Sequence, residues 1–196
     1  MALVEERAGN ATARRAMIES QLRVSGVNDL TILGAFSALT RENYVPEAAR
    51  TVAYMDRAVP LGDGSVLAPA LTHGQMLIAA EPLMADNVLV IGKPGAYLGA
   101  LVARLVGTVT VAAPDGNWDA QAPYSLILID GAIEVAPETL GAVLADRGRV
   151  VTGMIERGVA RLAIGRRVAG ELLFTKLAEA DFAALPEFAA KKSWSF

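Results

Sequence analysis

The chain has 196 residues, of which 53% are hydrophobic and 20% are charged, and its formal net charge is −3. This composition provides for a sizeable core and excludes a disordered chain or a strongly basic surface for nucleic acid. Because cysteine is absent and His73 is the single histidine, it also excludes disulfides, thiolate metal sites and histidine-based metal clusters.

Neither a secretory signal nor a membrane span is expected. Residues 1–7 are acidic and contain no apolar segment of the kind that secretory signals carry. Apolar stretches elsewhere are interrupted by Gly, Pro or charge before the ~20 residues that a membrane span needs. We therefore expect a cytoplasmic protein with no metal and no membrane or nucleic-acid partner.

The N-terminal part of the chain is predicted to be helical. Residues 12–39 have helical spacing with a break at Gly26, and Asn28 or Asp29 is expected to cap the second helix. Further on, residues 43–46 predict a turn or extended piece and residues 58–69 a loop. The apolar positions expected on the helix faces are Met17, Ile18, Leu22, Val24, Leu30, Ile32, Leu33, Ala35, Phe36 and Leu39.

From residue 87 onward, short apolar runs alternate with helical segments. A helix is predicted just before this region, at residues 72–83, and two more within it, at residues 97–105 and 137–144. Strands are predicted at residues 87–91, 108–112, 124–129, 149–152, 159–164, 172–177 and 193–196.

This alternation indicates an α/β fold with a mostly parallel sheet that is covered on both faces. Strands without intervening helices near the end of the chain indicate an antiparallel C-terminal edge. We expect one compact domain, in which an N-terminal helical extension and loop region (residues 1–86) packs on the core (residues 87–196).

The turn Gly92-Lys93-Pro94-Gly95-Ala96-Tyr97 after the first strand is the main candidate site. Ligands of open α/β sheets bind outside the carboxyl ends of the strands, and a glycine-rich turn before a helix presents backbone N–H groups there. Lys93 would add a positive charge for an anion or a polar cofactor tail. The alternative is a tight turn without a ligand, because a short glycine-rich turn is a weak signal.

Four further residues are candidates for a functional role. Asp130 ends the third strand and either belongs to the site or caps the following helix, which we favour. His73 could act as a general base, but no acidic partner is evident in the sequence, and a surface or loop-packing role is preferred. Asp63 lies in the 58–69 loop and could touch a ligand. Trp118 is expected to plug an emptied cleft.

The sequence resembles protein-L-isoaspartate O-methyltransferases from about residue 14 to its C-terminus. The N-terminal matches are the most specific, and later segments continue the likeness. The matching segments are Met17-Ile-Glu-Ser-Gln-Leu-Arg23, Arg41-Glu-Asn-Tyr-Val-Pro46, Ala53-Tyr-Met-Asp-Arg57, Pro60-Leu-Gly62, Ala122-Pro-Tyr124, Ile127-Leu-Ile-Asp-Gly-Ala132, Gly148-Arg-Val150 and Leu185-Pro186.

The resemblance implies a Rossmann-like methyltransferase sheet. It also implies transfer of a methyl group from S-adenosylmethionine to the carboxylate of isoaspartyl residues in damaged proteins, so a protein or peptide is the implied partner. By position, the residues expected to contact the cofactor are Gly92, Lys93, Gly95, Tyr97, Asp115 and Asp130. No catalytic residue is identified.

The glycine-rich turn departs from the family pattern, which is acid-x-Gly-x-Gly-x-Gly-Tyr. Val90 stands in place of the acid, Pro94 in place of the second glycine and Ala96 in place of the third. Proline fixes φ near −65° and removes an N–H donor, although Gly95 could partly compensate.

Three other departures also fall on the donor and substrate regions. Ala113 stands where an acid normally ends the second strand, and Asp115 is the nearest substitute. Residues 114–123 replace a helix and a strand, so the sheet is expected to be shortened and to lack the adenine wall. The family's Thr-Ile-Ser-Gln-Pro-like segment, which belongs to its substrate loop, reads Val66-Leu-Ala68-Pro69 here.

Three functions fit these observations. The first is an active methyltransferase with an atypical donor site. The second, which we favour, is a degenerate family member with weakened or lost S-adenosylmethionine binding. It would be a binding or scaffold protein with a filled cleft, which could act as a homodimer. The third is a binder of another small anion through Lys93 and the 92–96 turn.

Overall fold

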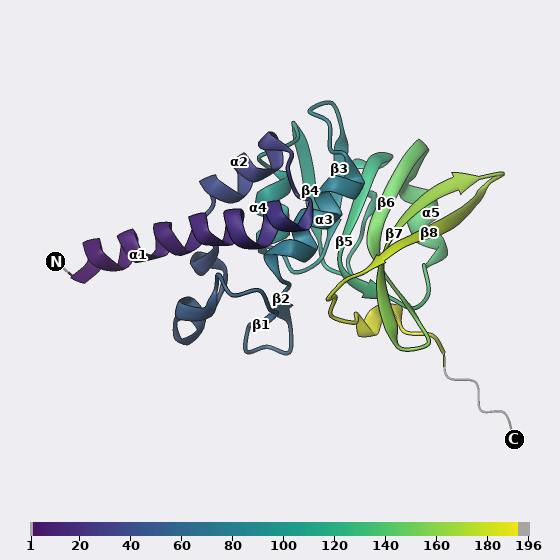
Figure 1. The fold of residues 1–196 in the computed structure, drawn as a ribbon. Helices are drawn as coiled ribbons and strands as arrows, with labels where there is room; N and C mark the ends of the chain where they lie inside the picture. Colours follow the sequence, from purple (N-terminus) through teal and green to yellow (C-terminus); the bar gives the residue numbers. More distant parts are fainter. Residues whose placement is uncertain (1, 192–196) are drawn as a thin grey trace, which may run out of the picture.

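The computed structural model describes residues 2–191, so the strand predicted at 193–196 lies outside the described residues. Its main feature is a six-stranded sheet in the order β4-β3-β5-β6-β7-β8 (Figure 1). The strands are β3 (Asn87–Ile91), β4 (Thr108–Ala112), β5 (Tyr124–Ile133), β6 (Leu144–Glu156), β7 (Val159–Val168) and β8 (Glu171–Glu179).

The sheet has the mixed topology that the sequence predicts. Strands β4, β3, β5 and β6 pair in parallel, whereas β6–β7 and β7–β8 pair antiparallel. Helix α4 (Tyr97–Val102) connects β3 to β4, and α5 (Glu138–Val143) connects β5 to β6. Between β4 and β5 the chain forms a loop with one short 3-10 helix, Asp119–Gln121, so the predicted shortening of the sheet is confirmed.

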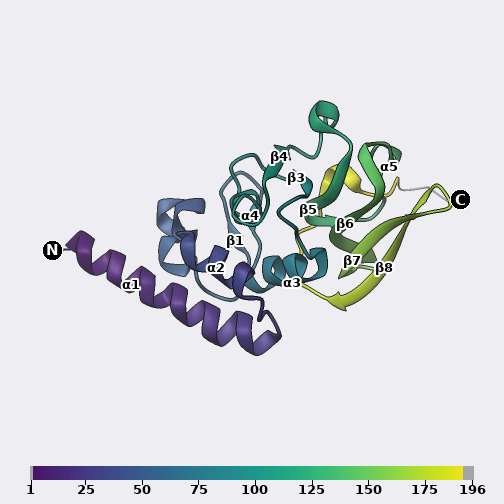
Figure 2. The ribbon, with the colours of Figure 1, turned by 90° about the horizontal axis from the view of Figure 1, so that it is seen from above.

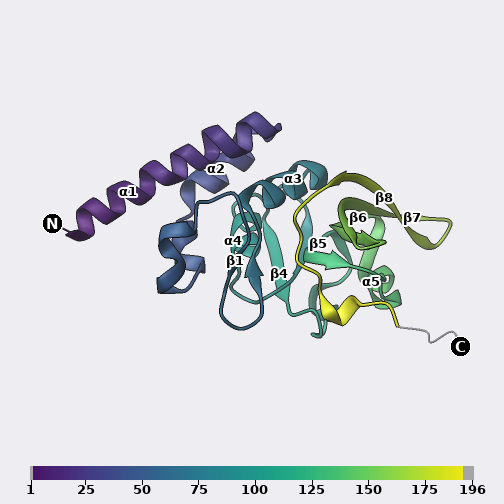
Figure 3. The same cartoon turned by 60° about the horizontal axis from the view of Figure 1, so that its bottom comes forward.

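Alternate residues of the central strands face opposite layers, as the period of two in a strand requires. Val88, Val90 and Leu128 join a core cluster with helices α2 (Leu30–Ala38), α3 (Ala70–Ala80) and α4. Their neighbours Leu89 and Ile129 join a second cluster with α5 and the segment around Phe188. Figure 3 shows the two layers, with α2 and α3 on one side of the sheet and α5 on the other.

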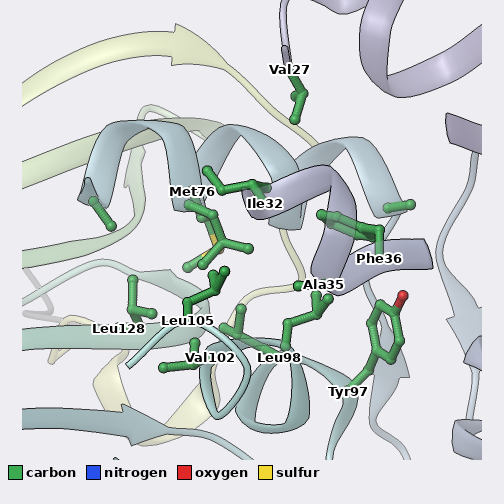
Figure 4. Close-up of a cluster of buried hydrophobic side chains, with 14 of the residues drawn as sticks. Val27, Ile32, Ala35, Phe36, Met76, Tyr97, Leu98, Val102, Leu105 and Leu128 are labelled. Atoms are coloured by element: carbon green, nitrogen blue, oxygen red, sulfur yellow. The ribbon is translucent and has the colours of Figure 1, made fainter. Parts of the chain in front are cut away.

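The N-terminal helices pack on this core through their apolar face. Helix α1 (Ala2–Met17) projects away from the sheet, as Figure 2 shows, and continues into a π-helical turn, Ile18–Leu22, and a 3-10 turn, Arg23–Ser25. Side chains of α2, α3 and α4 then meet in one buried cluster that includes Phe36, Met76 and Leu98 (Figure 4). Residues 1–86 and 87–196 therefore share a core, and whether they unfold as one unit stays a prediction.

The caps of the helices explain where they begin and end. The Asp29 side chain accepts hydrogen bonds from the N–H groups of Thr31 and Ile32, which confirms the predicted cap. Helix α3 begins after Pro69 and ends at Ala80, and the next residue, Glu81, has a left-handed φ of 47° and precedes Pro82. The prediction of a helix to residue 83 is therefore wrong, because proline cannot continue the hydrogen-bond ladder.

Two other local predictions are wrong. Val24 is 74% exposed and does not share the buried face of Met17 and Leu22, because the helix changes to 3-10 geometry there. The predicted 58–69 loop contains a two-stranded ribbon of β1 (Val59–Pro60) and β2 (Val66–Leu67). The turn or extended piece predicted at residues 43–46 is confirmed, because the 3-10 turn of residues 41–44 is followed by the extended Val45.

Candidate functional site

The candidate site is a cavity of about 750 Å³ at the carboxyl ends of the parallel strands. From β3 the chain crosses first to β4 on one side and later to β5 on the other, so β3 lies at the switch point where open α/β sheets bind ligands. The walls come from the 92–97 turn, the β1–β2 ribbon, the ends of β4 and β5, and the C-terminal segment 183–187.

The glycine-rich turn is shaped by close packing. Gly92 donates to the carbonyl of Ala112 at 2.9 Å, and a Cβ built on Gly92 would lie only 2.9 Å from the Cβ of Asp130. Gly95 has a φ of +79°, which favours glycine. The predicted residues Gly92, Lys93, Gly95, Tyr97 and Asp130 all line the cavity.

Lys93 is already paired with a carboxylate from the opposite wall. Its Nζ lies 2.5 Å from Oδ2 of Asp63, at the tip of the β1–β2 ribbon. This hydrogen bond and two from Ser65, donated by its hydroxyl and its backbone N–H, hold the pKa of Asp63 well below its usual range. Because α4 has only six residues and the Lys93 charge is matched, the turn offers little for an external anion.

His73 and Asp130 form a buried pair beneath the cavity. Nε2 of His73 lies 2.9 Å from Oδ1 of Asp130, and the His73 side chain is fully buried while that of Asp130 is 16% exposed. Both favoured predictions are therefore wrong. His73 is no surface residue, because it has an acidic partner, and Asp130 turns toward His73 while Pro137 occupies the cap position of α5. The partners lie 57 residues apart, so no local pattern reveals them.

Tyr97 and Arg41 extend this buried polar group. The Arg41 guanidinium lies 4.9 Å from the centre of the Tyr97 ring and donates to the carbonyls of Ala53 at 2.7 Å and Ala68 at 2.6 Å. Burial raises the pKa of Tyr97 to about 12 and lowers the pKa of Arg41. The Tyr97 hydroxyl is buried and has no hydrogen-bond partner among the described residues.

At the end of β4 the cavity wall is apolar. Ala113 and Pro114 line it, whereas Asp115 is exposed and is not among the lining residues. Trp118 does not plug the cavity, contrary to prediction. It is 7% exposed, packs on Phe188 with ring centroids 6.0 Å apart, and donates its indole N–H to the carbonyl of Ala113. The open cavity also contradicts the expected filled cleft.

The C-terminal segment completes the cavity, a role that the sequence did not reveal. Ala132 in β5 donates to the carbonyl of Ala183 at 2.7 Å, and Leu185 donates back to Ala132 at 2.9 Å. These bonds place Ala184, Leu185 and Glu187 against the site. Among the described residues no three His, Asp or Glu side chains gather to hold a metal ion, and no helix there is long and apolar enough to cross a membrane.

A parallel sheet with a switch-point cavity and an antiparallel C-terminal edge is the Rossmann-like fold of methyltransferases. A solved protein-L-isoaspartate O-methyltransferase superimposes with a TM-score of 0.75 at 18% identity, over 90% of this chain and 67% of that one. Another from Plasmodium falciparum, in complex with S-adenosyl-L-homocysteine, gives a TM-score of 0.73 at 14% identity, over 91% and 98% of the two chains.

Sequence comparisons give the family directly. The model of the protein-L-isoaspartate (D-aspartate) O-methyltransferase family matches residues 12–113. The protein-L-isoaspartate O-methyltransferase of Koribacter versatilis is 30% identical, over 94% of this chain and 96% of its own. The chain therefore belongs to the protein-L-isoaspartate O-methyltransferase family.

Proposed function

We propose that this family member is a ligand-binding protein in which S-adenosylmethionine binding has been weakened or lost. The observation that carries the proposal is Ala113, which directly follows the carboxyl end of β4 and lines the cavity. In dinucleotide-binding folds an acid about 20 residues after the glycine-rich turn accepts the ribose hydroxyls. Without an acceptor, burying those hydroxyls costs roughly 1–3 kcal/mol.

The turn after β3 also fits S-adenosylmethionine poorly. Pro94 has no N–H to offer, and Ala96 stands where the family pattern has its third glycine. Val90, at the family's acidic position, is 2% exposed and packs in the core of the sheet. The side chains of these three residues provide no polar contact for a nucleoside.

The third mismatch concerns the part of the cavity where the adenine ring of S-adenosylmethionine would lie. Strand β4 is the margin of the sheet, and the segment between β4 and β5 folds toward Phe188 through Trp118. Of this segment only Ala113 and Pro114 line the cavity, so it provides no aromatic or extended surface against which an adenine ring could stack. Taken together, these three mismatches support the proposal that S-adenosylmethionine binding is weakened or lost.

An active methyltransferase is the second candidate, and the open cavity favours it. A volume of about 750 Å³ is large enough for a cofactor-sized ligand, and a structural relative holds S-adenosyl-L-homocysteine. Because the family acts on proteins, we propose a protein or peptide as the partner in either case. The cytoplasmic location and the homodimer stay predictions.

Calorimetric titration of the full chain with S-adenosylmethionine separates the two candidates. We expect no saturable heat in the micromolar range and no methyl transfer to an isoaspartyl peptide. In Ala113→Asp, a carboxylate returns to the end of β4, and we expect affinity for S-adenosylmethionine to rise by about tenfold if the ribose hydroxyls reach it. Micromolar binding to the unaltered chain, with methyl transfer, would refute the proposal.

A further inference from the structure

The floor of the cavity holds a carboxylate that three separate elements position. Asp130 at the end of β5 is held by His73 of α3, and Gly92 after β3 leaves the space that its side chain needs. Because a carboxylate only accepts hydrogen bonds, Nε2 of His73 must donate to Oδ1. None of the described residues donates to Oδ2, and that oxygen lies on the side of Gly92, which also lines the cavity.

None of the other charged residues that line the cavity is a cation available to pair with Asp130. Lys93 is paired with Asp63, and Glu187 at the rim adds a further carboxylate. Arg41 lies behind Tyr97 and partly offsets the charge of Asp130. Two of its nitrogens donate to backbone carbonyls, however, so its guanidinium is engaged away from the cavity. The lining residues thus carry an excess of negative charge.

Apolar side chains make up most of the remaining wall. Val45, Leu67 and Leu185 line the cavity from three different segments, and the buried, unpartnered hydroxyl of Tyr97 belongs to a fourth lining residue. An apolar pocket with few polar groups binds a ligand that has an apolar body and one matching polar head. A free carboxylate oxygen is best matched by a charged donor, because charge-assisted hydrogen bonds are the stronger ones.

We propose that this cavity binds an alkylammonium group, with the cation against Oδ2 of Asp130 and the alkyl chain along Val45, Leu67 and Leu185. The inference rests on the proposed function and names the ligand class for the same cavity. An isoaspartyl carboxylate in this cavity would approach the like charge of Asp130, so the proposal predicts that such a substrate binds poorly here. The alkylammonium group could come from a free amine or from a lysine side chain.

Three ligands of equal length test the proposal on the full, unaltered chain. The thermal unfolding midpoint is measured with n-pentylamine, n-pentanol and n-pentanoate at equal concentration and ionic strength, followed by calorimetric titration. We expect pentylamine to raise the midpoint most and pentanoate least, because only a ligand that prefers the folded state stabilises it. Nα-acetyl-lysine methylamide then distinguishes a lysine side chain from a free amine as the source.

Variants locate the site. Asp130→Asn should weaken pentylamine binding by about tenfold or more, because a charge-assisted hydrogen bond is lost. Asp115→Asn makes the same chemical change at an exposed residue outside the cavity and should bind pentylamine unchanged. Equal stabilisation by pentanoate and pentylamine would overturn the proposal, and this comparison needs no variant.

The two proposals fail in different ways. Absence of both amine and S-adenosylmethionine binding overturns the alkylammonium site alone. Micromolar S-adenosylmethionine binding overturns the proposed function, and if pentylamine does not compete with it, the alkylammonium site falls as well.

Discussion

Arg149 and Asp86 form a two-pronged contact at the amino ends of the strands. Nη2 of Arg149 lies 2.8 Å from Oδ2 of Asp86, and Nη1 lies 3.3 Å from Oδ1. Arg149 also donates to the carbonyls of Ala80 and Glu81 at the end of α3. One side chain of β6 thereby joins the helix that carries His73 to the turn that begins β3.

Asp86→Asn should make stability less sensitive to acid. Burial alone would raise the pKa of Asp86, but hydrogen bonds from Arg149, Ser125 and the Leu83 N–H together lower it. A depressed folded pKa contributes stability above the unfolded value of about 3.9, and that stability is lost as pH falls through the folded value.

We therefore expect Asp86→Asn to be less stable than the unaltered chain by about 2 kcal/mol at neutral pH. The difference should shrink toward pH ~3. Urea unfolding at both pH values measures it, with the exposed Asp56→Asn as the control. A constant difference at both pH values would contradict the role of Asp86.

Arg41→Leu should destabilise the fold strongly. Arg41 is fully buried, and its loss leaves the carbonyls of Ala53 and Ala68 unpaired and removes the cation above Tyr97. We expect the free energy of unfolding to fall by about 3 kcal/mol in urea titrations. The exposed Arg50→Leu should change it by no more than about 0.5 kcal/mol. Equal effects of the two would refute this account.

Lys93→Met should loosen the β1–β2 ribbon without unfolding the protein. Lys93 and Asp63 are both about half exposed, so their pair adds little to global stability. It is nonetheless a direct link between the ribbon tip and the 92–97 turn. We expect faster amide exchange at Leu61 and an unchanged urea midpoint, and high salt should have the same effect on the unaltered chain.

Lys176→Met removes an exposed pair with Glu156, far from the ribbon, and serves as the control. If it accelerated exchange at Leu61 as much as Lys93→Met does, the link across the cavity would not be what holds the ribbon.

Gly153→Ala should destabilise the contact between β6 and the C-terminal segment. A Cβ at this position would lie 2.7 Å from Cγ of Phe182 and 2.8 Å from Cβ of Ala132. We expect a loss of about 1–3 kcal/mol from overpacking, measured by thermal and urea unfolding. Gly141→Ala in α5 meets no atom within 4 Å and should instead stabilise by roughly 0.5–1 kcal/mol. A neutral Gly153→Ala would show that Phe182 can move aside.

Much of the sheet could be predicted from the sequence because its signals are local. Strands β3 and β4 are continuous apolar or β-branched runs bounded by Gly or a turn, and their predicted and observed residues coincide. Strand β6 extends from Leu144 through the exposed Arg147, which has a left-handed φ of 61°. Its irregular first part has no strand pattern, so only residues 149–152 were predicted.

The site could be predicted only in part, for a physical reason. The turn at 92–97 and the end of β5 are recognisable, because strand ends at a switch point face the ligand. The His73–Asp130 pair and the packing of Trp118 on Phe188 depend on contacts between residues far apart in the sequence. Composition and spacing carry no information about such contacts, which therefore had to come from the structure.

The loss of a strand beyond β4 changes what the protein presents to its neighbours. An inner strand of a parallel sheet became an outer one, and outer strands invite unwanted pairing with other chains. Here that strand is only five residues long, and it lies between Gly107 and Pro114. A short strand that ends near a proline is a poor template for pairing with a strand of another chain. The shortened sheet therefore does not expose a long edge for aggregation.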